Sequence, residues 1–337
     1  MIITRTPYRM SFFGGGTDYP VWFREHGGAV LATTIDRYCY ITCRHLPPFF
    51  EHKSRVVYSR IEDVSSNHDI QHPAVRGVLQ FLKVETGIEI HHDGDLPARA
   101  GLGSSSAFTV GFLHAIEALR GKMLTKMELA RQAIHVEQEL LHESVGCQDQ
   151  VMTAFGNLQR VNFFPDGEIG VNPVVVNYRR TEELQQHLLL YFTGSSRIAS
   201  EIAKDQIQRT PELKSELTAL YQMVDEAQAI LSSGQDIVEF GRLLHEGWQI
   251  KRGLTTKIVT PKVDAIYEAA RTAGAIGGKL KGWAAEGSCC SLPVPRITRR
   301  SKPRSRGSSR CRSDSTFTAA RSLFTSRIVC WRPNSWA

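Results

Sequence analysis

The chain of 337 residues, 42% of them hydrophobic, is long enough to fold into two lobes around a large core. It has no apolar run of about eighteen residues and no basic leader followed by an apolar stretch, so we expect neither a membrane span nor a secretory signal. The seven cysteines show no zinc-site or disulfide spacing, and Cys39 and Cys43 fit the buried face of a strand. These features predict a cytoplasmic protein without a membrane partner.

The net charge of +7 is confined to the last part of the chain. Residues 281–337 contain ten Arg and two Lys against Glu286 and Asp314, so they contribute +10 and residues 1–280 contribute −3. A mildly acidic body does not favour a nucleic-acid partner. The same segment holds four of the seven cysteines and three of the five tryptophans, and it follows neither helical nor strand periodicity.

Apolar periodicity predicts the elements in chain order. Strands are expected at Ile2–Thr6, Gly28–Leu46 and Ile88–His92, and a helix at His72–Thr86. Three helices follow at Ser104–Leu119, Thr125–His142 and Gln148–Phe155, the second opened by a capping box. Next come strands at Asn157–Phe163, Glu168–Asn177 and His187–Thr193, and finally helices at Ser196–Gln208, Pro211–Ser232, Ile237–Leu254 and Pro261–Thr272.

This order lacks strict strand–helix alternation and predicts an α+β protein of two lobes. We place the first lobe at residues 1–168, the second at residues 169–280, and an unusual basic tail at residues 281–337.

Residues 97–107, Pro-Ala-Arg-Ala-Gly-Leu-Gly-Ser-Ser-Ser-Ala, predict a phosphate-binding loop. Gly101 and Gly103 allow close backbone approach and positive φ, and the serines fall on a helix's first turn, where free amides favour an anion. Two alternatives remain: an ordinary serine-capped helix, or a hydrolase elbow, Gly-x-Ser-x-Gly, with Ala107 in the last place. The elbow requires a buried strand running into the serine, whereas a loop precedes it here.

Three further groups could serve phosphoryl transfer, which needs a Mg²⁺ shell and an acceptor for the hydroxyl proton. A glycine turn, residues 14–16, presents Thr17 and Asp18 just after Arg9, an arrangement suited to a polyhydroxylated substrate but also typical of a capped turn. Glu137 lies on a predicted helix, where a carboxylate is usually solvated. Asp149 opens a short helix and could simply cap it.

Taken together, these motifs resemble the GHMP kinases, a family that includes galactokinase, homoserine kinase, mevalonate kinase and phosphomevalonate kinase. The resemblance covers residues 1–280, and Leu188–Arg197 and Gly277–Leu280 are most similar to the heptose 7-phosphate kinases, with fucokinase-like sugar kinases next. It implies a first lobe like ribosomal protein S5 domain 2 and a ferredoxin-like second lobe, with the site between them. It also implies ATP and Mg²⁺ as cofactors and a small sugar phosphate as substrate; a homodimer is the remaining partner to consider.

The resemblance assigns roles to individual residues. ATP phosphates would contact Gly101, Leu102, Gly103, Ser104, Ser105, Ser106 and Ala107. Ser105 and Glu137 would hold Mg²⁺, and Asp149 would be the base or orient the sugar hydroxyl. The sugar would contact Arg9, Gly16, Thr17 and Asp18.

The chain departs from the family after Leu280, where a glycine loop, Gly-Ala-Gly-Gly-Gly-Gly-Phe, should follow. Our hypothesis is a reading-frame shift near Leu280–Gly282. Codons that start on the third base of each present codon from Trp283 to Cys290 can spell Gly-Gly-Gly-Gly-Phe-Leu-Leu, because Trp283–Ala284 must give glycine and Cys289–Cys290 must give leucine. We therefore expect the second lobe to lose its last strands and glycine loop, and this chain to be unstable and weakly active or inactive.

Three competing functions remain open beside the sugar kinase. They are a serine hydrolase, a non-enzymatic sugar- or nucleotide-binding remnant left by the loss of the glycine loop, and a basic nucleic-acid binder. The last is disfavoured because removal of residues 281–337 would remove the net positive charge.

Overall fold

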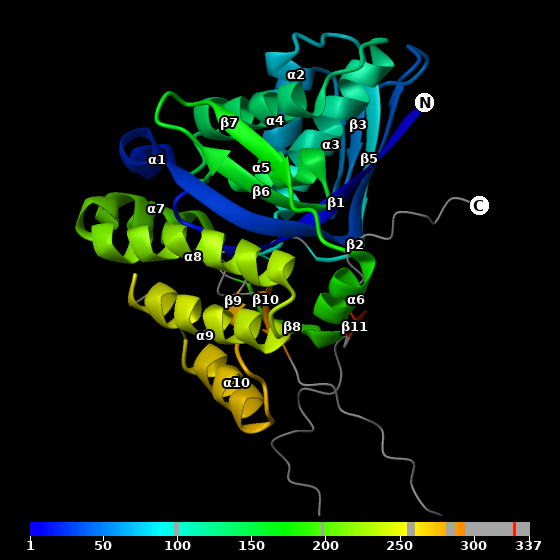
Figure 1. Ribbon diagram of the computed structural model, residues 1–337. Helices are drawn as coiled ribbons and strands as arrows, with labels where there is room; N and C mark the ends of the chain where they lie inside the picture. The colour runs from blue at the N-terminus through cyan, green and yellow to red at the C-terminus, as the bar shows by residue number, and fades with distance from the viewer. Residues whose placement is uncertain (98–100, 197–198, 255–259, 281–286, 294–325, 328–337) are drawn as a thin grey trace, which may run out of the picture.

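The computed structural model spans residues 1–337 and describes all of them except 98–100, 197–198, 255–259, 281–286, 294–325 and 328–337. Two lobes lie one above the other in Figure 1, each built on its own β-sheet. This arrangement confirms the predicted α+β class with two lobes. Among the described residues, no helix combines the length and the apolar composition needed to cross a membrane.

The upper lobe contains a seven-stranded sheet in the order β4-β3-β5-β2-β6-β7, with β1 paired to β2 beside this path. Its strands are β1 (Ile2–Phe13), β2 (Gly28–His45), β3 (Ser54–Val57), β4 (Ile61–Val64), β5 (Ile88–Gly94), β6 (Leu158–Phe163) and β7 (Ile169–Pro173). Strand β2 is a single long strand, and it pairs with β1, β5 and β6. Strand β1 continues beyond the predicted end at Pro7 because a register shift accommodates the proline, which cannot donate to the ladder.

Helices of the first lobe cover one face of this sheet (Figure 1). They are α2 (Pro73–Phe81), α3 (Ser104–Leu119), α4 (Lys126–His135) and α5 (Gln148–Phe155). Most of α3 is buried, as its apolar composition on all sides requires, and it packs on β1 and β2. A short helix, α1 (Pro20–His26), and a 3₁₀ turn, η1 (Asn67–Asp69), complete the connections.

The expected helix over Thr125–His142 is interrupted. It begins with the predicted capping box between Thr125 and Glu128, but α4 ends at His135 and a π-helical turn, η2 (Val136–Leu140), follows. Such turns often accompany functional sites because the extra residue re-aims the side chains around it. Glu137 lies within this turn.

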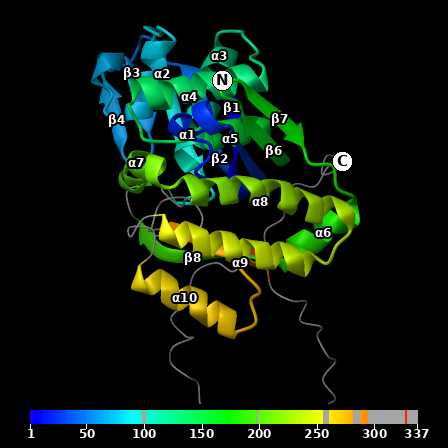
Figure 2. The ribbon, with the colours of Figure 1, turned by 60° about the vertical axis from the view of Figure 1, so that its left-hand side comes forward.

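The lower lobe contains a four-stranded sheet in the order β11-β8-β10-β9. Its elements are α6 (Tyr178–His187), β8 (Leu188–Ser196), α7 (Ala199–Arg209), η3 (Thr210–Glu212), α8 (Lys214–Ser233), α9 (Ile237–Gly253), α10 (Pro261–Thr272), β9 (Lys279–Leu280), β10 (Gly287–Pro293) and β11 (Ser326–Arg327). Helix α8 joins the lobes, because it packs on α9 and also contacts β1 and β2 (Figure 2).

Two expectations about the chain's second half need correction. Strand β7 pairs with β6, so the first sheet extends past residue 168, and the strand predicted to reach Asn177 ends at Pro173 and is followed by α6. Strand β10 pairs with β8 and β9, so the second sheet has strands in the segment where we expected their loss. The missing glycine motif and most of the tail, residues 281–286, 294–325 and 328–337, lie outside the described residues.

Candidate active site

The predicted phosphate loop has the backbone that its glycines suggested. Gly101 and Gly103 adopt positive φ values of 72° and 74°, which confirms the prediction, and α3 begins directly afterwards at Ser104. Gly101, Gly103, Ser104 and Ser105 line a cavity of about 150 Å³ between the lobes. The first turn of α3 therefore borders this cavity, and the free amides of a helix's first turn favour an anion.

Behind this loop, Ser106 contacts the buried Glu137. The Ser106 hydroxyl donates to Glu137 Oε2 at 2.9 Å, and the Gln150 side-chain amide donates to the same oxygen. Burial, followed by the nearby charge of Glu143, raises the pKa of Glu137 to about 8. Glu137 Oε1 has no hydrogen-bond partner within the described parts of the chain. A buried carboxylate with an unmet oxygen fits a cation such as Mg²⁺, which prefers one or two carboxylates together with substrate phosphates.

The serine in contact with Glu137 is Ser106, whereas the sequence prediction paired Glu137 with Ser105. Ser106 contacts Glu137, whereas Ser105 is exposed at the cavity and its carbonyl accepts from Thr109. The described residues contain no group of three or more His, Cys, Asp or Glu side chains that could hold a metal by themselves.

Arg9 and Asp149 form an ion pair in the wall of the cavity. Arg9 Nε donates to Asp149 Oδ1 at 2.7 Å, Nη2 donates to Oδ2 at 2.5 Å, and Nη1 donates to the Gly101 carbonyl at 2.9 Å. The Arg9 side chain is 6% exposed and that of Asp149 is 24% exposed. This two-point geometry fixes the carboxylate next to the phosphate loop, and it leaves part of Asp149 open to a ligand. The structure thus brings together two residues predicted separately.

Asp18 lies in the same cavity wall and is held by backbone amides. Its Oδ1 accepts from Gly16 N at 3.0 Å and its Oδ2 from Gln148 N at 3.3 Å. Burial raises the pKa of Asp18, and these two hydrogen bonds oppose that shift. A Cβ on Gly146 would lie 1.9 Å from Asp18 Oδ2, so only glycine allows the chain to pass this close to the carboxylate.

Besides Ser106, four of the predicted contact residues do not line the cavity and have packing positions. Thr17 is fully buried, and its hydroxyl bonds the carbonyl groups of Gly14 and Ala29, so it holds the turn. Gly16 supplies an amide to Asp18. The Leu102 side chain is buried, and the Ala107 amide donates to the Gly103 carbonyl within the helix.

Sequence analysis missed the two lysines that the second lobe contributes to the cavity, Lys251 on α9 and Lys279 on β9. Both are buried, at 6% and 7% exposure. A lysine in an amphipathic helix or a short strand ordinarily reaches water, so neither carried a local signal. Their burial arises only when the lobes meet.

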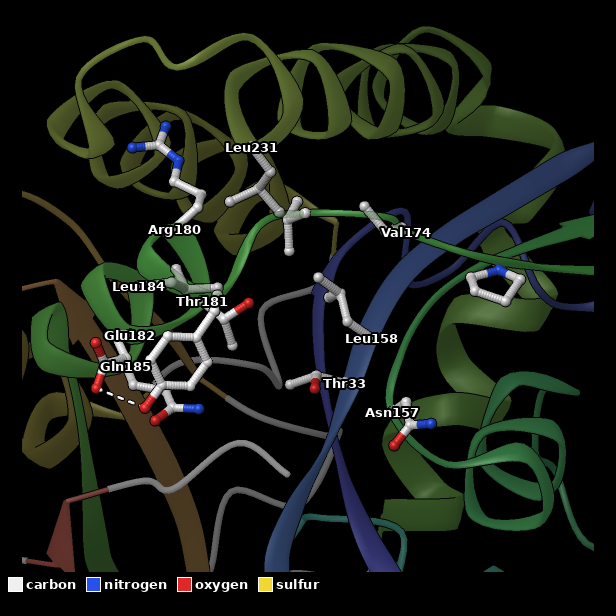
Figure 3. Close-up of a pocket in the computed structure, with 13 residues that line it drawn as sticks. Thr33, Asn157, Leu158, Val174, Arg180, Thr181, Glu182, Leu184, Gln185 and Leu231 are labelled. Carbon is white, nitrogen blue, oxygen red and sulfur yellow. Dashed lines mark hydrogen bonds between the residues drawn. The ribbon is translucent and has the colours of Figure 1, made fainter. Parts of the chain in front are cut away.

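A larger hollow of about 340 Å³ lies between β6, β7, α6 and α8 (Figure 3). Its walls include Leu158, Val174, Leu184 and Leu231, and the Arg180 guanidinium points away from it to the carbonyl groups of Ile230 and Gln235. None of the predicted site residues lines it. The smaller cavity, which gathers the charged groups, is therefore the candidate active site.

Comparison with known proteins finds related kinases. Residues 72–157 match the family model "GHMP kinases N terminal domain". The chain is 27% identical over 302 residues to a D-glycero-alpha-D-manno-heptose 7-phosphate kinase of Campylobacter jejuni, covering 85% of this chain and 87% of that protein. It is 32% identical over 227 residues to a mevalonate kinase of Pyrococcus horikoshii, which covers 66% of this chain and 64% of that protein.

Solved structures show the same likeness in three dimensions. A D-glycero-D-manno-heptose 1-phosphate kinase from Bacteroides thetaiotaomicron superposes with a TM-score of 0.71 at 25% identity, over 87% of this chain and 88% of that one. A Streptococcus pneumoniae phosphomevalonate kinase bound to phosphomevalonate and AMPPNP has a TM-score of 0.69 at 16% identity, over 88% and 93%, and shares the fold. The likeness extends over most of the chain, which carries a match to the N-terminal domain of the GHMP kinases and is similar to kinases that transfer phosphate to a hydroxyl acceptor.

Proposed function

We propose that the chain is a cytoplasmic, ATP- and Mg²⁺-dependent sugar kinase that phosphorylates a heptose phosphate, D-glycero-D-manno-heptose 7-phosphate in particular. The observation that carries this proposal is the Arg9–Asp149 pair, because it fixes a partly open carboxylate in the same cavity as the glycine loop. The heptose phosphate is the substrate in the names of two relatives that resemble most of the chain.

In the reaction, the acceptor hydroxyl oxygen attacks the terminal phosphorus of ATP. A new O–P bond forms, the bond to the bridging oxygen breaks, and ADP leaves with that electron pair. Asp149 accepts the proton from the attacking hydroxyl, and Arg9 keeps the carboxylate aimed at it. The amides of the first α3 turn and the side chains of Ser104 and Ser105 hold the phosphates of ATP.

Mg²⁺, when bound, would neutralise charge on those phosphates. Glu137 would hold it, together with the Ser106 hydroxyl, because these two groups meet behind the loop and Glu137 Oε1 lacks a protein partner among the described residues. We therefore propose Ser106 as the hydroxyl ligand, in place of Ser105.

The test is an assay of ADP formation with heptose 7-phosphate and ATP, using the wild-type chain, Asp149→Asn, and Asp69→Asn as an exposed control. Loss of the base should lower kcat by about three orders of magnitude and leave ATP binding intact, since general-base catalysis typically contributes 10²–10⁴-fold. The control should retain full activity. Turnover by Asp149→Asn at the wild-type rate would contradict the assignment.

The reading-frame hypothesis remains a prediction about the residues after Leu280. We propose that the unshifted gene encodes the efficient kinase and that this chain turns over weakly. Sequencing the DNA for residues 270–337 tests it directly: one base gained or lost near codon 281 would restore Gly-Gly-Gly-Gly-Phe. Turnover by the full 337-residue chain at rates typical of small-molecule kinases, about 1–100 s⁻¹, would refute the proposed loss of activity.

A further inference from the structure

The side chain of Gln150 is a buried amide that uses only part of its hydrogen-bonding capacity. Gln150 lies in the first turn of α5 and is 0% exposed. Its Nε2 donates to Glu137 Oε2, whereas its Oε1 has no partner among the residues that the structure describes. A buried polar atom without a partner carries the full cost of its desolvation, which an apolar side chain of the same length would avoid. An amide at this position therefore needs an explanation.

The hydrogen bonds to Glu137 leave one oxygen of its carboxylate bare. The Ser106 hydroxyl and the Gln150 amide both donate to Oε2, and within the described parts of the chain Oε1 receives no hydrogen bond. The Thr109 hydroxyl is near enough to lower the pKa of Glu137 as well, but it donates to the Ser105 carbonyl at 3.2 Å. A carboxylate held through one oxygen presents the other in a fixed direction, as a ligand to a cation requires.

Three rigid elements fix this arrangement. Glu137 comes from the π-helical turn η2, Ser106 from the first turn of α3 and Gln150 from the first turn of α5, and α3 packs on both η2 and α5. Donors on packed helices keep their positions without a ligand, so the carboxylate is oriented in advance. The charge of Glu143 is close enough to raise the pKa of Glu137, and a bound cation would relieve this repulsion.

The unmet oxygen of Gln150 suits a water molecule that accompanies such a cation. Mg²⁺ usually keeps several waters when one or two carboxylates bind it, and an amide oxygen accepts hydrogen bonds that water donates. We propose that Gln150 is a positioning residue for Mg²⁺: its Nε2 holds Glu137 so that Glu137 Oε1 is free for the ion, and its own Oε1 accepts from a water of the ion's hydration shell. This proposal rests on the proposed Mg²⁺ site and adds a residue that does not itself bind the metal.

The experiment measures the binding of AMPPNP to the full chain by calorimetry, once with EDTA and once with saturating Mg²⁺. Gln150→Met should lower the affinity for the magnesium complex of AMPPNP roughly tenfold to a hundredfold, because loss of a residue that orients a metal ligand typically costs this much in metal affinity. Its affinity for metal-free AMPPNP should stay within about twofold of the wild type. The association of Mg²⁺ with free AMPPNP is the same for every variant, so differences between variants report on the protein.

Gln159→Met is the matched control. Gln159 on β6 is 4% exposed, donates through Nε2 to the Gly156 carbonyl at 2.9 Å, and also has an Oε1 without a partner in the described chain. The control therefore removes an equally buried amide that does not contact Glu137. Both of its affinities should stay within about twofold of the wild type, and a loss of Mg²⁺-dependent affinity equal to that of Gln150→Met would overturn the proposal.

A parallel titration of Glu137→Gln separates this proposal from the proposed Mg²⁺ site. If Glu137→Gln loses Mg²⁺-dependent affinity but Gln150→Met does not, the metal site stands and the role of Gln150 is refuted. If neither variant changes that affinity, both proposals fail. Equal weakening of metal-free and magnesium-bound AMPPNP by Gln150→Met would indicate a structural role and refute positioning. If Gln150→Met does not fold, Gln150→Asn, which withdraws the amide by one methylene, should show the same selective loss.

Discussion

The Arg9–Asp149 pair permits a quantitative test of how the carboxylate proposed as the catalytic base is held. At a charge separation of about 4 Å and an effective dielectric constant of about 20, two unit charges attract by about 4 kcal/mol. Because Asp149 is 24% exposed, solvent screens part of this attraction, and we expect about half of it, roughly 2 kcal/mol, to appear as coupling. The contact of Arg9 with the Gly101 carbonyl survives the loss of Asp149 and does not enter the coupling.

The assay is a double-mutant cycle with Arg9→Met, Asp149→Asn and the double variant, using the free energy of unfolding from urea titrations. Each single change should destabilise the chain, because it leaves the partner charge in a largely buried position. The double variant should be more stable than the sum of the single changes predicts, by about 2 kcal/mol. Adding salt to 0.5 M should change this coupling little, since Arg9 is 6% exposed.

Additive effects, with a coupling below about 0.5 kcal/mol, would refute the conclusion that the pair is preorganised in the free protein. The kinetic counterpart is that Arg9→Met should lower kcat with heptose 7-phosphate while Asp149 remains present. In that case Arg9 acts as a positioning residue for the base.

Three further predictions concern single residues. Glu137→Gln should abolish the additional thermal stabilisation of the protein that Mg²⁺ provides when ATP is present, and it should lower kcat on the order of a hundredfold. Thermal melts and initial rates measure these two effects, and an unchanged Mg²⁺ dependence would contradict the metal assignment. Because the pKa of Lys251 falls from 10.5 to about 8 on folding, the unfolded chain binds more protons between these values, so stability should rise with pH there. Between pH 7 and pH 10.5, the free energy of unfolding of the wild type should rise by about 3 kcal/mol relative to that of Lys251→Met, as measured by urea unfolding. If the difference between the two proteins is the same at both pH values, the prediction is refuted. Gly146→Ala should cost about 2–4 kcal/mol in the same assay because its Cβ would overlap a buried carboxylate, whereas Gly253→Ala, with nothing within 4 Å, should be nearly neutral.

Local chemistry explains which parts of the fold could be predicted from the sequence. The positive φ at Gly101 and Gly103 and the capping box at Thr125 are decided within a few residues, so the sequence indicates them directly. Helix α6 was missed although Asn177 caps it, because the helix is largely polar and shows no apolar stripe. The short strands β3 and β4 were missed because four residues are too few for a periodic pattern.

The site itself was predicted in part for the same reason. Motif residues such as Ser104 and Asp149 stand in recognisable runs, and the structure places both in the cavity. Thr17 belongs to an equally recognisable run, yet its hydroxyl serves the backbone, because sequence does not show which way a side chain in a tight turn points. Lys251 and Lys279 come to line the cavity only through contacts between lobes, and such contacts leave no trace in a short window of sequence.

Because the two lobes each supply a wall of the cavity, the two walls should respond differently to partial loosening of the protein. The wall proposed to hold the nucleotide is built from the glycine loop and α3, which belong to one lobe and follow each other in the chain. The wall opposite it depends on β1 meeting α9 and β9, elements more than 200 residues apart, as the hydrogen bond from Lys279 Nζ to the Phe12 carbonyl illustrates. Mild heat or denaturant that loosens the lobes should therefore disturb the second wall before it disturbs the first. A partly damaged second lobe would leave the wall proposed for the nucleotide intact and would disrupt the wall that α9 and β9 supply.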